Sequence, residues 1–502
     1  MPATASQLAS LLEGKIIVSS DILDSDLQGM EMQELVSLVL SHFSGASDGI
    51  KLLKKETLKE ILAKVKSEKT PLDVEIIRSS DFSPIAKDIN SEFEVRNSKI
   101  ESVSSSVNDF VAHFTNRFER QKAILVRNRS IQGIIDIGSM NNYMNGREIS
   151  LVGMVYDKVI TKNGHVLVTL EDGTGTASVL FVKPYKNERN FNADLFVSAT
   201  KILKDDVIAV KGKLSNKLVI ANTVVWPDIP VHMRKKTEED IAIAFISDTQ
   251  VGHKLFMEKQ FNKLLEWFNG NVDYRKDLAK KVKYIVFDGD LVDGVGIYPN
   301  QDKELLIDDV YRQYSVFFDL VSKIPEYIEV FVQPGNHDAV QRAEPQPMLP
   351  KELTQGDLPS NVHLATNPSN LVLDGINVLA YHGTSLDSVI HDTPGCTYAR
   401  PETAMMEVLK RRHLSPIYGG NVIVPSRDDG MVIDSVPDIV EMGHVHKNAA
   451  TDYHGTLLVN SGAWQARTSF QIRLGHLPSP GFLPVYETKN MTVSTLDFNT
   501  IP

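Results

Sequence analysis

The pattern of apolar and polar positions changes near residue 140 and again near residue 240. Before the first change, apolar residues recur at helical spacing, as in Met30–His42 and Lys51–Lys69. We therefore expect a helical N-terminal domain over residues 1–70. Residues 71–140 predict a linker, because serines such as Ser104–Ser106 interrupt the periodicity, with one helix at Val107–Arg120.

Between residues 141 and 230, apolar and polar positions alternate as they do in half-buried strands. Five such stretches, separated by turn signals such as Asp172-Gly173, predict a small antiparallel barrel. They are Arg147–Tyr156, His165–Leu170, Thr176–Phe181, Val207–Leu214 and Leu218–Val225. A barrel of this size is most often an OB-fold, which commonly binds single strands through aromatic and basic residues. Phe181 and Tyr185 are the candidate aromatics; because aromatics are few here, a structural or subunit-contact role is the alternative.

From residue 241 onward, short and wholly apolar stretches alternate with helical patterns, which indicates an α/β domain over residues 241–502. The predicted strands are Ile241–Ile246, Tyr284–Phe287, Glu329–Val332, Asn377–Tyr381 and Ile439–Val440. Helical patterns at Lys259–Phe268 and Leu306–Val321 lie between them, and strand-like character returns after Leu457. Together with the helical and barrel regions, this predicts a multidomain α+β protein.

The amino-acid composition limits the class of protein and the compartment in which it is expected. With 42% apolar and 23% charged residues, the chain is an ordinary globular protein. A single cysteine, Cys396, excludes an intrachain disulfide and a cysteine-rich zinc site, and it fits a reducing, cytoplasmic setting. The chain has neither a signal-peptide pattern at Met1–Lys15 nor an apolar run of about 18 residues, so no membrane span is expected.

The net charge of −11 argues against a chain that coats nucleic acid through its overall charge. It leaves open a local basic groove, or a partner that supplies the positive charge. The segment Lys51–Lys69 has seven lysines against three glutamates. Either it contacts nucleic acid or a partner, or it is the solvated face of an ordinary helix.

Each predicted strand of the α/β region runs into a cluster of metal-ligand residue types. Because functional groups gather at the carboxyl ends of strands in such folds, we expect these clusters to converge. Carboxylate, amide and imidazole groups together suit divalent ions such as Mn, Fe or Zn. The candidate ligands are Asp248, Asp290, Asn336, His382, His444 and His446. Asp290 is the natural bridge between two ions, and His337 is the candidate to stabilise developing charge or protonate a leaving oxygen.

The order of these motifs resembles the calcineurin-like metallophosphoesterase superfamily over Ile241–Arg467. Four further stretches carry a more specific resemblance: IYPNQ (Ile297–Gln301), PGNHDAV (Pro334–Val340), GHVHKN (Gly443–Asn448) and NSGAWQARTSFQ (Asn460–Gln471). With them, nearly the whole chain resembles the small subunits of archaeal family D DNA polymerase.

The resemblance implies a helical N-terminal region, an OB-fold barrel and a four-layer α/β/β/α calcineurin-like phosphoesterase domain. It implies two divalent metal ions, Mn first and Mg, Fe or Zn as alternatives. It also implies a 3′–5′ exonuclease that proofreads single-stranded or mismatched DNA ends for a large catalytic subunit. The implied partners are that subunit and DNA, with the sliding clamp as a further candidate, and no membrane.

One position departs from the family pattern. Family members usually carry His two residues after the first Asp, where this chain has Gln250. Gln250 offers a neutral oxygen to the first metal position, beside Asp248, Asp290 and His446, and it would bind a soft ion less well than an imidazole. His253 is a candidate substitute. Gln250 therefore indicates weakened activity, a changed metal preference, or a scaffold role like that of eukaryotic relatives that have lost the ligands.

Two other phosphoesterase classes fit less well. Protein phosphatases usually carry Arg where this chain has Gly294, and Glu where it has Asp338. Recombination nucleases share the motifs but place the phosphoesterase near the N-terminus, whereas here it begins near residue 241.

Overall fold

The computed structural model describes residues 76–100, 105–127, 130–184, 193–354, 356 and 358–501, together with 16–19, 51–58 and five single positions before residue 40. The chain forms two compact units, residues 1–75 and 76–502. In the first unit, β1 (Ile16–Val18) pairs in parallel with β2 (Lys51–Leu53), and a helical turn follows at 55–58. The helix predicted at Lys51–Lys69 is therefore wrong at its start. The rest of that segment and most of Met30–His42 lie outside the described residues.

Two six-stranded sheets form the centre of the second unit. The first has the order β12-β11-β10-β9-β18-β19, and the second has the order β16-β17-β15-β14-β13-β3. The first consists of β9 (Ala242–Ile246), β10 (Val282–Asp288), β11 (Glu329–Gln333), β12 (Val362–Leu364), β18 (Phe482–Glu487) and β19 (Thr492–Asp497). The second consists of β3 (Phe93–Asn97), β13 (Ser369–Leu373), β14 (Ile376–Ala380), β15 (Ile439–Met442), β16 (Ala449–Tyr453) and β17 (Thr456–Asn460). Phe245 and Val286 of the first sheet share one buried core with Val378 and Val459 of the second, so the sheets pack face to face.

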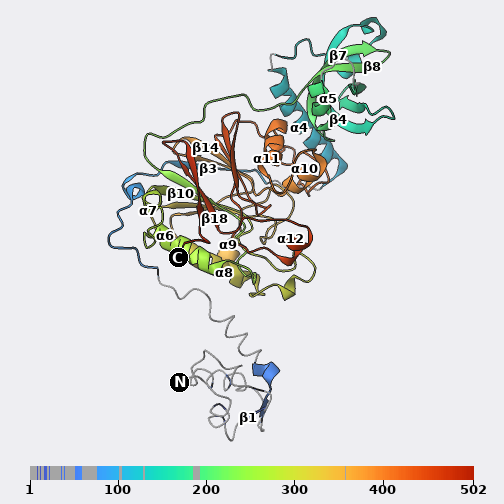
Figure 1. Ribbon diagram of the computed structural model, residues 1–502. Helices are drawn as coiled ribbons and strands as arrows, with labels where there is room; N and C mark the ends of the chain where they lie inside the picture. The colour runs from blue at the N-terminus through green and yellow to red at the C-terminus, as the bar shows by residue number, and fades with distance from the viewer. Residues whose placement is uncertain are drawn as a thin grey trace. The chain divides into compact units, whose positions relative to one another are not determined.

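Helices cover the outer faces of both sheets (Figure 1). Phe317 of α8 packs against Phe287 of β10, with ring centroids 5.5 Å apart. On the other side, α10 and α11 share a core with Leu379 and Val440 of the second sheet. The helices are α6 (Glu258–Phe268), α7 (Lys276–Ala279), α8 (Val310–Val321), α9 (Lys351–Thr354), α10 (Leu386–Asp392), α11 (Glu402–Arg411) and α12 (Ser469–Arg473), with the 3-10 turn η5 (Gln301–Lys303). The unit therefore has helices, sheet, sheet and helices as successive layers.

The predicted five-stranded barrel is present and closed, with the order β4-β5-β6-β8-β7, but it is not wholly antiparallel, because β6 and β8 pair in parallel. Its strands are β4 (Glu148–Ile160), β5 (Val166–Asp172), β6 (Gly175–Phe181), β7 (Val207–Ser215) and β8 (Leu218–Val225), and α5 (Ala193–Thr200) packs against it. Phe181, a candidate strand-binding aromatic, is wrong in that role because its side chain is fully buried in the barrel core. Tyr185 lies outside the described residues.

The segment expected to be a linker is largely part of the sandwich. β3 completes the second sheet by pairing antiparallel with β13. Before it, the turn η2 (Ile85–Asp88) is held by the buried amine of Lys283, which donates to Ala86 O at 3.1 Å and Ile89 O at 2.7 Å. The helix predicted at Val107–Arg120 is confirmed as α4 (Val107–Val126), and the turns η3 (Ile137–Ser139) and η4 (Asn142–Met144) lead to the barrel. The serine run read as a periodicity breaker ends in Ser106, the N-cap of α4.

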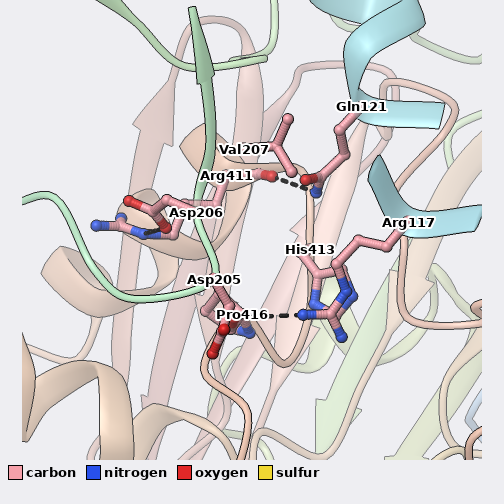
Figure 2. Close-up of a pocket in the computed structure, with 8 residues that line it drawn as sticks. All are labelled: Arg117, Gln121, Asp205, Asp206, Val207, Arg411, His413 and Pro416. Atoms are coloured by element: carbon pink, nitrogen blue, oxygen red, sulfur yellow. Dashed lines mark hydrogen bonds and ion pairs between the residues drawn. The ribbon is translucent and has the colours of Figure 1, made fainter. Parts of the chain in front are cut away.

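Buried ion pairs join α4 and the barrel to the sandwich around a small polar pocket (Figure 2). Arg117 of α4 donates to Asp429 at 2.8 Å, and Arg411 of α11 donates to Asp206, just before β7, at 2.8 Å. Gln121 donates to Arg411 O at 2.8 Å. Buried charges this well paired are costly to separate, so α4 links the barrel to the sandwich. Within the described part of the chain, every helix is too short or too polar to cross a bilayer.

Candidate metal centre

The loops after β9, β10 and β15 hold predicted ligands in an uncommon backbone conformation. Five of these residues have positive φ angles: Asp248 51°, Gln250 51°, Asp290 50°, His444 66° and His446 54°. A non-glycine residue in this region costs about 1–2 kcal/mol. Such strain persists where the surrounding fold enforces it, and it gathers at functional sites.

Asp248, Asp290 and His382 form the buried centre of the site, with one ligand atom of each within 4.8 Å of the others. His382 Nε2 lies 3.3 Å from Asp290 Oδ1 and 3.1 Å from Asn336 Oδ1. His382 Nδ1 lies 2.7 Å from Asp288 O, a backbone acceptor. The proton of the neutral ring therefore belongs on Nδ1, which leaves the Nε2 lone pair toward the carboxylates.

The two histidines after β15 approach Asp248. His446 Nε2 lies 3.2 Å from Asp248 Oδ1, and the backbone N–H of His444 donates to Asp248 Oδ2 at 2.9 Å. The rings of His382 and His444 are 5.4 Å apart. The structure thus brings all six predicted ligands into one connected network.

Gln250 also belongs to this network, through a bond that its amide nitrogen makes. Gln250 Nε2 donates to Asp290 Oδ2 at 2.9 Å. Its Oε1 is buried without a hydrogen-bond partner, and so is Asp248 Oδ1. His253, the candidate substitute, faces elsewhere: its Nδ1 accepts from Leu255 N at 2.9 Å, and its Nε2 lies 3.6 Å from Glu304.

His337 lies at the edge of the centre, with its side chain 19% exposed. Its backbone N–H donates to Asp290 Oδ1 at 2.8 Å. Its Nδ1 lies 2.9 Å from Asp293 O and can donate only in that direction, while Nε2 stands 3.9 Å from Asp290 Oδ2. His337 therefore presents Nε2 to the site, as a catalytic proton donor or acceptor must.

The electrostatics favour a cation. Burial raises the pKa of Asp290, but the imidazoles of His382 and His337 outweigh it and hold that pKa well below its usual range. Burial lowers the pKa of His382, but Asp290 reverses this and raises it well above the ordinary value. Burial also raises the pKa of Asp288 and of Glu441 well above the usual carboxyl range. Without a cation, protons must compensate this concentration of carboxylates.

Glycine is required at one close approach. A Cβ on Gly335 would lie 2.4 Å from Asp290 Oδ1 and 2.8 Å from His382 Nε2. Two residues after Asn336, Asp338 fixes the same loop by accepting from Gly335 N at 2.7 Å and Tyr314 OH at 2.8 Å. Burial, followed by the charge of Asp290, raises the pKa of Asp338 to about 6. Lack of space thus explains Gly335, and hydrogen bonds explain Asp338.

Three residues that touch the predicted ligands were missed by the sequence analysis. Asp387 of α10 lies 3.1 Å from His444 Nε2, Gln471 of α12 donates to His446 Nδ1 at 3.1 Å, and Asn367 accepts from His382 N at 3.0 Å. Each lies outside the strand-end clusters. The one signal present was that Gln471 closes the NSGAWQARTSFQ stretch.

The donor set fits divalent metal ions. It combines carboxylate, amide and imidazole groups, the ligands of first-row divalent ions. Asp248 Oδ1 and Gln250 Oε1 are buried and make no hydrogen bond, although His446 Nε2 lies 3.2 Å from Asp248 Oδ1, and such oxygens are the kind of atoms that an ion would satisfy. The α+β sandwich and its buried cluster of carboxylate, amide and imidazole groups place this chain in a class: proteins with a site suited to divalent metal ions.

Comparison with known proteins then identifies the family. The family model for the DNA polymerase alpha/epsilon B-subunits matches residues 243–451, which include every predicted ligand. The DNA polymerase II small subunit of Archaeoglobus fulgidus is 39% identical, over 77% of this chain and 76% of the relative. Those of Methanothermobacter thermautotrophicus and Pyrococcus furiosus are 37% and 36% identical, over 83% and 85% of this chain and 83% and 72% of the relatives. The chain belongs to the family of archaeal DNA polymerase II small subunits.

Proposed function

We propose that this chain is a two-metal 3′–5′ exonuclease that removes nucleotides from single-stranded or mismatched DNA ends. It would act as the proofreading subunit of a replicative DNA polymerase, bound to a large catalytic subunit. The observation that carries the proposal is the buried network of Asp248, Asp290 and His382, in which one oxygen each of Asp248 and Gln250 makes no hydrogen bond. In this proposal the sandwich is a calcineurin-like domain and the barrel is an OB-fold.

The residues divide between two ion positions that share Asp290. One position has Asn336, His382 and His444 beside Asp290. The other has Asp248, Gln250 and His446 beside it. Ions bound there would activate water and neutralise the oxygens of a phosphodiester.

His337 moves the proton in this scheme. Asp293 O holds its Nδ1–H, so Nε2 is the nitrogen that faces a substrate. In its protonated form, Nε2–H donates to the oxygen that leaves when the phosphodiester is cut. Because Asp290 binds the backbone N–H of His337, the shared carboxylate also positions the group that acts on the substrate.

The test is release of mononucleotides from a 3′-labelled strand by the purified protein with Mn. We expect activity in the native chain, preference for an unpaired end, and loss of activity in His337→Ala with Mn binding retained. His363→Ala is the matched control, because His363 pairs with Glu329 at 2.8 Å outside the centre. A native chain that neither binds Mn nor releases nucleotides would refute the proposal.

A second candidate function, a non-catalytic scaffold, is favoured by one observation. The amide of Gln250 donates to Asp290 Oδ2, the oxygen that a shared carboxylate would offer to an ion. If that bond persists, the first ion position stays closed and the fold serves as a binding platform. Metal analysis of the native complex separates the two candidates, because a scaffold retains at most one ion per chain.

A further inference from the structure

The chain from Trp464 to Ser479 borders the candidate centre and is attached to it at several points. Trp464 N donates to Asp248 O at 2.9 Å, and Ser479 N donates to His446 O at 2.8 Å. Between them lies α12, whose Gln471 contacts His446 (Figure 1). This segment, residues 464–479, is called the rim below.

The rim presents exposed apolar side chains beside a site rich in charge. Phe470 is 57% exposed, Ile472 57%, Leu474 54% and Leu477 66%. Large apolar side chains gathered on one short stretch mark a contact surface more often than scattered ones do. Phe470 is the aromatic member, so it offers a flat face as well as apolar area.

Two cations, Arg467 and Arg473, belong to the rim itself. A third, Lys447, directly follows His446, which Gln471 of the rim contacts. In the part of the chain that the structure describes, none of the three forms an ion pair, and Arg467 Nε is buried without a hydrogen-bond partner. The nearby acids are engaged: Asp387 by His444 and Tyr398, and Glu304 by Ser469 and Tyr298.

We propose that the rim binds the unpaired 3′-terminal segment of a DNA strand. Phe470 stacks on a base while Arg467 and Arg473 contact the phosphates. Charge complementarity supports this occupant, since unpaired cations are set beside apolar side chains in a chain of net charge −11. This inference rests on the proposed function and names how its substrate is held.

In this proposal, the rim would prefer unpaired DNA ends over paired ones. A base inside a duplex has both faces covered by its neighbours and a paired end base has one, whereas an unpaired base can turn away from the duplex and stack on Phe470. A correctly paired end would lose that contact, and a mismatched end would gain it. The rim therefore provides a physical basis for selecting frayed ends without reading the base sequence.

The test measures strand binding apart from cleavage. The full chain is titrated with short labelled oligo(dT) in EDTA, and stacking is followed with a terminal 2-aminopurine. We expect Phe470→Ala to weaken binding by about tenfold and to abolish the quenching of 2-aminopurine, while Phe470→Trp binds at least as tightly as the native chain. Arg473→Gln should lower the salt dependence of binding by about 0.7 in log–log slope. Arg427→Gln, at an exposed arginine outside the rim, is the matched control and should leave it unchanged.

Two outcomes would overturn the inference. One is native strand affinity in Phe470→Ala. The other is loss of affinity for the large subunit in that variant with strand binding intact, which would make the rim a protein interface. Mn-dependent cleavage, measured on the same samples, reports on the proposed function independently: strand binding that depends on Phe470 without any cleavage supports the rim and removes the exonuclease.

Discussion

Gln250 and Asp387 each contact a different candidate ligand through a hydrogen bond. Gln250 uses an amide N–H to bind Asp290, where an imidazole would offer a lone pair to an ion. Asp387 accepts from His444 Nε2, which leaves His444 Nδ1 as the free lone pair. The two bonds lead to opposite predictions for metal binding.

Replacing Gln250 with histidine should strengthen the first ion position. Gln250→His removes the amide donor from Asp290 and adds an imidazole ligand. Changes in residues that only orient a ligand alter metal affinity by about 10–100-fold, so a new ligand should tighten Mn binding by at least about tenfold. Titration calorimetry with Mn, alongside the nucleotide-release rate, checks this. Unchanged affinity would mean that Gln250 does not limit the site.

Removing the carboxylate of Asp387 should weaken the second position. Asp387→Asn can still contact His444, but its amide no longer selects the Nε2–H form of the ring. We expect Mn affinity to fall by about 10–100-fold with little change in folding. Asp392→Asn, on the same helix and beside its neighbour His391 at 3.4 Å, is the control. Equal affinities in the two variants would refute the role assigned to Asp387.

At the scale of elements, α4 is the piece that joins the barrel to the sandwich. Its side chains His113, Arg117 and Gln121 are buried against the loops around Arg411 and Asp429. A helix whose inward face is charged depends on its partners more than an apolar helix does, because an unpaired buried charge is strongly destabilising.

Asp429 is the buried carboxylate that compensates the charge of α4. It accepts from Arg117 at 2.8 Å and lies 2.9 Å from His413 Nε2, all fully buried. Asp429→Asn should cost about 3–5 kcal/mol of unfolding free energy, because it leaves the Arg117 charge uncompensated. Asp428→Asn removes an exposed ion pair with Arg120 and should cost less than about 1 kcal/mol. Urea denaturation of both variants measures the two losses of unfolding free energy. Similar losses in the two variants would contradict the role assigned to Asp429.

At the scale of the whole molecule, this junction also sets how the fold responds to acid. Burial, followed by the charge of Arg117, lowers the pKa of His413 from 6.5 to about 4, although Asp429 opposes the shift. Between these values the unfolded chain binds a proton that the folded chain does not, so stability falls as pH falls. Arg117 and His113 of α4 lie against Asp429, the carboxylate that His413 contacts, and Arg117 first and then His113 help to lower the pKa of His413.

We therefore expect the unfolding free energy to drop by up to about 3 kcal/mol as the pH is lowered from 6.5 toward 4. His413→Gln should lose this part of the pH dependence while keeping a hydrogen-bond donor near Asp429. Denaturation curves at about pH 7 and about pH 5 measure the difference. A variant with the same pH slope as the native chain would show that His413 is not the responsible group.

Local patterns in the sequence predicted the strands and the candidate ligands that follow them. Apolar runs and alternation are local signals, and a metal-ligand residue directly after a buried strand needs no knowledge of distant contacts. The five barrel strands and α4 were predicted for the same reason. The segment around Phe93–Asn97 was misread as a linker, because a short exposed strand is defined by the partner it pairs with, here β13.

The contacts of the candidate ligands depend on how distant parts of the chain pack together. The amide of Gln250 meets a carboxylate 40 positions along the chain, Asp387 meets a histidine 57 positions away, and Arg117 meets Asp429 across 312. Which nitrogen of a histidine faces the site, and which oxygen is left without a partner, follow from such contacts. They arise only when the sheets have packed, because hydrogen bonds between distant residues leave no periodic trace in the sequence.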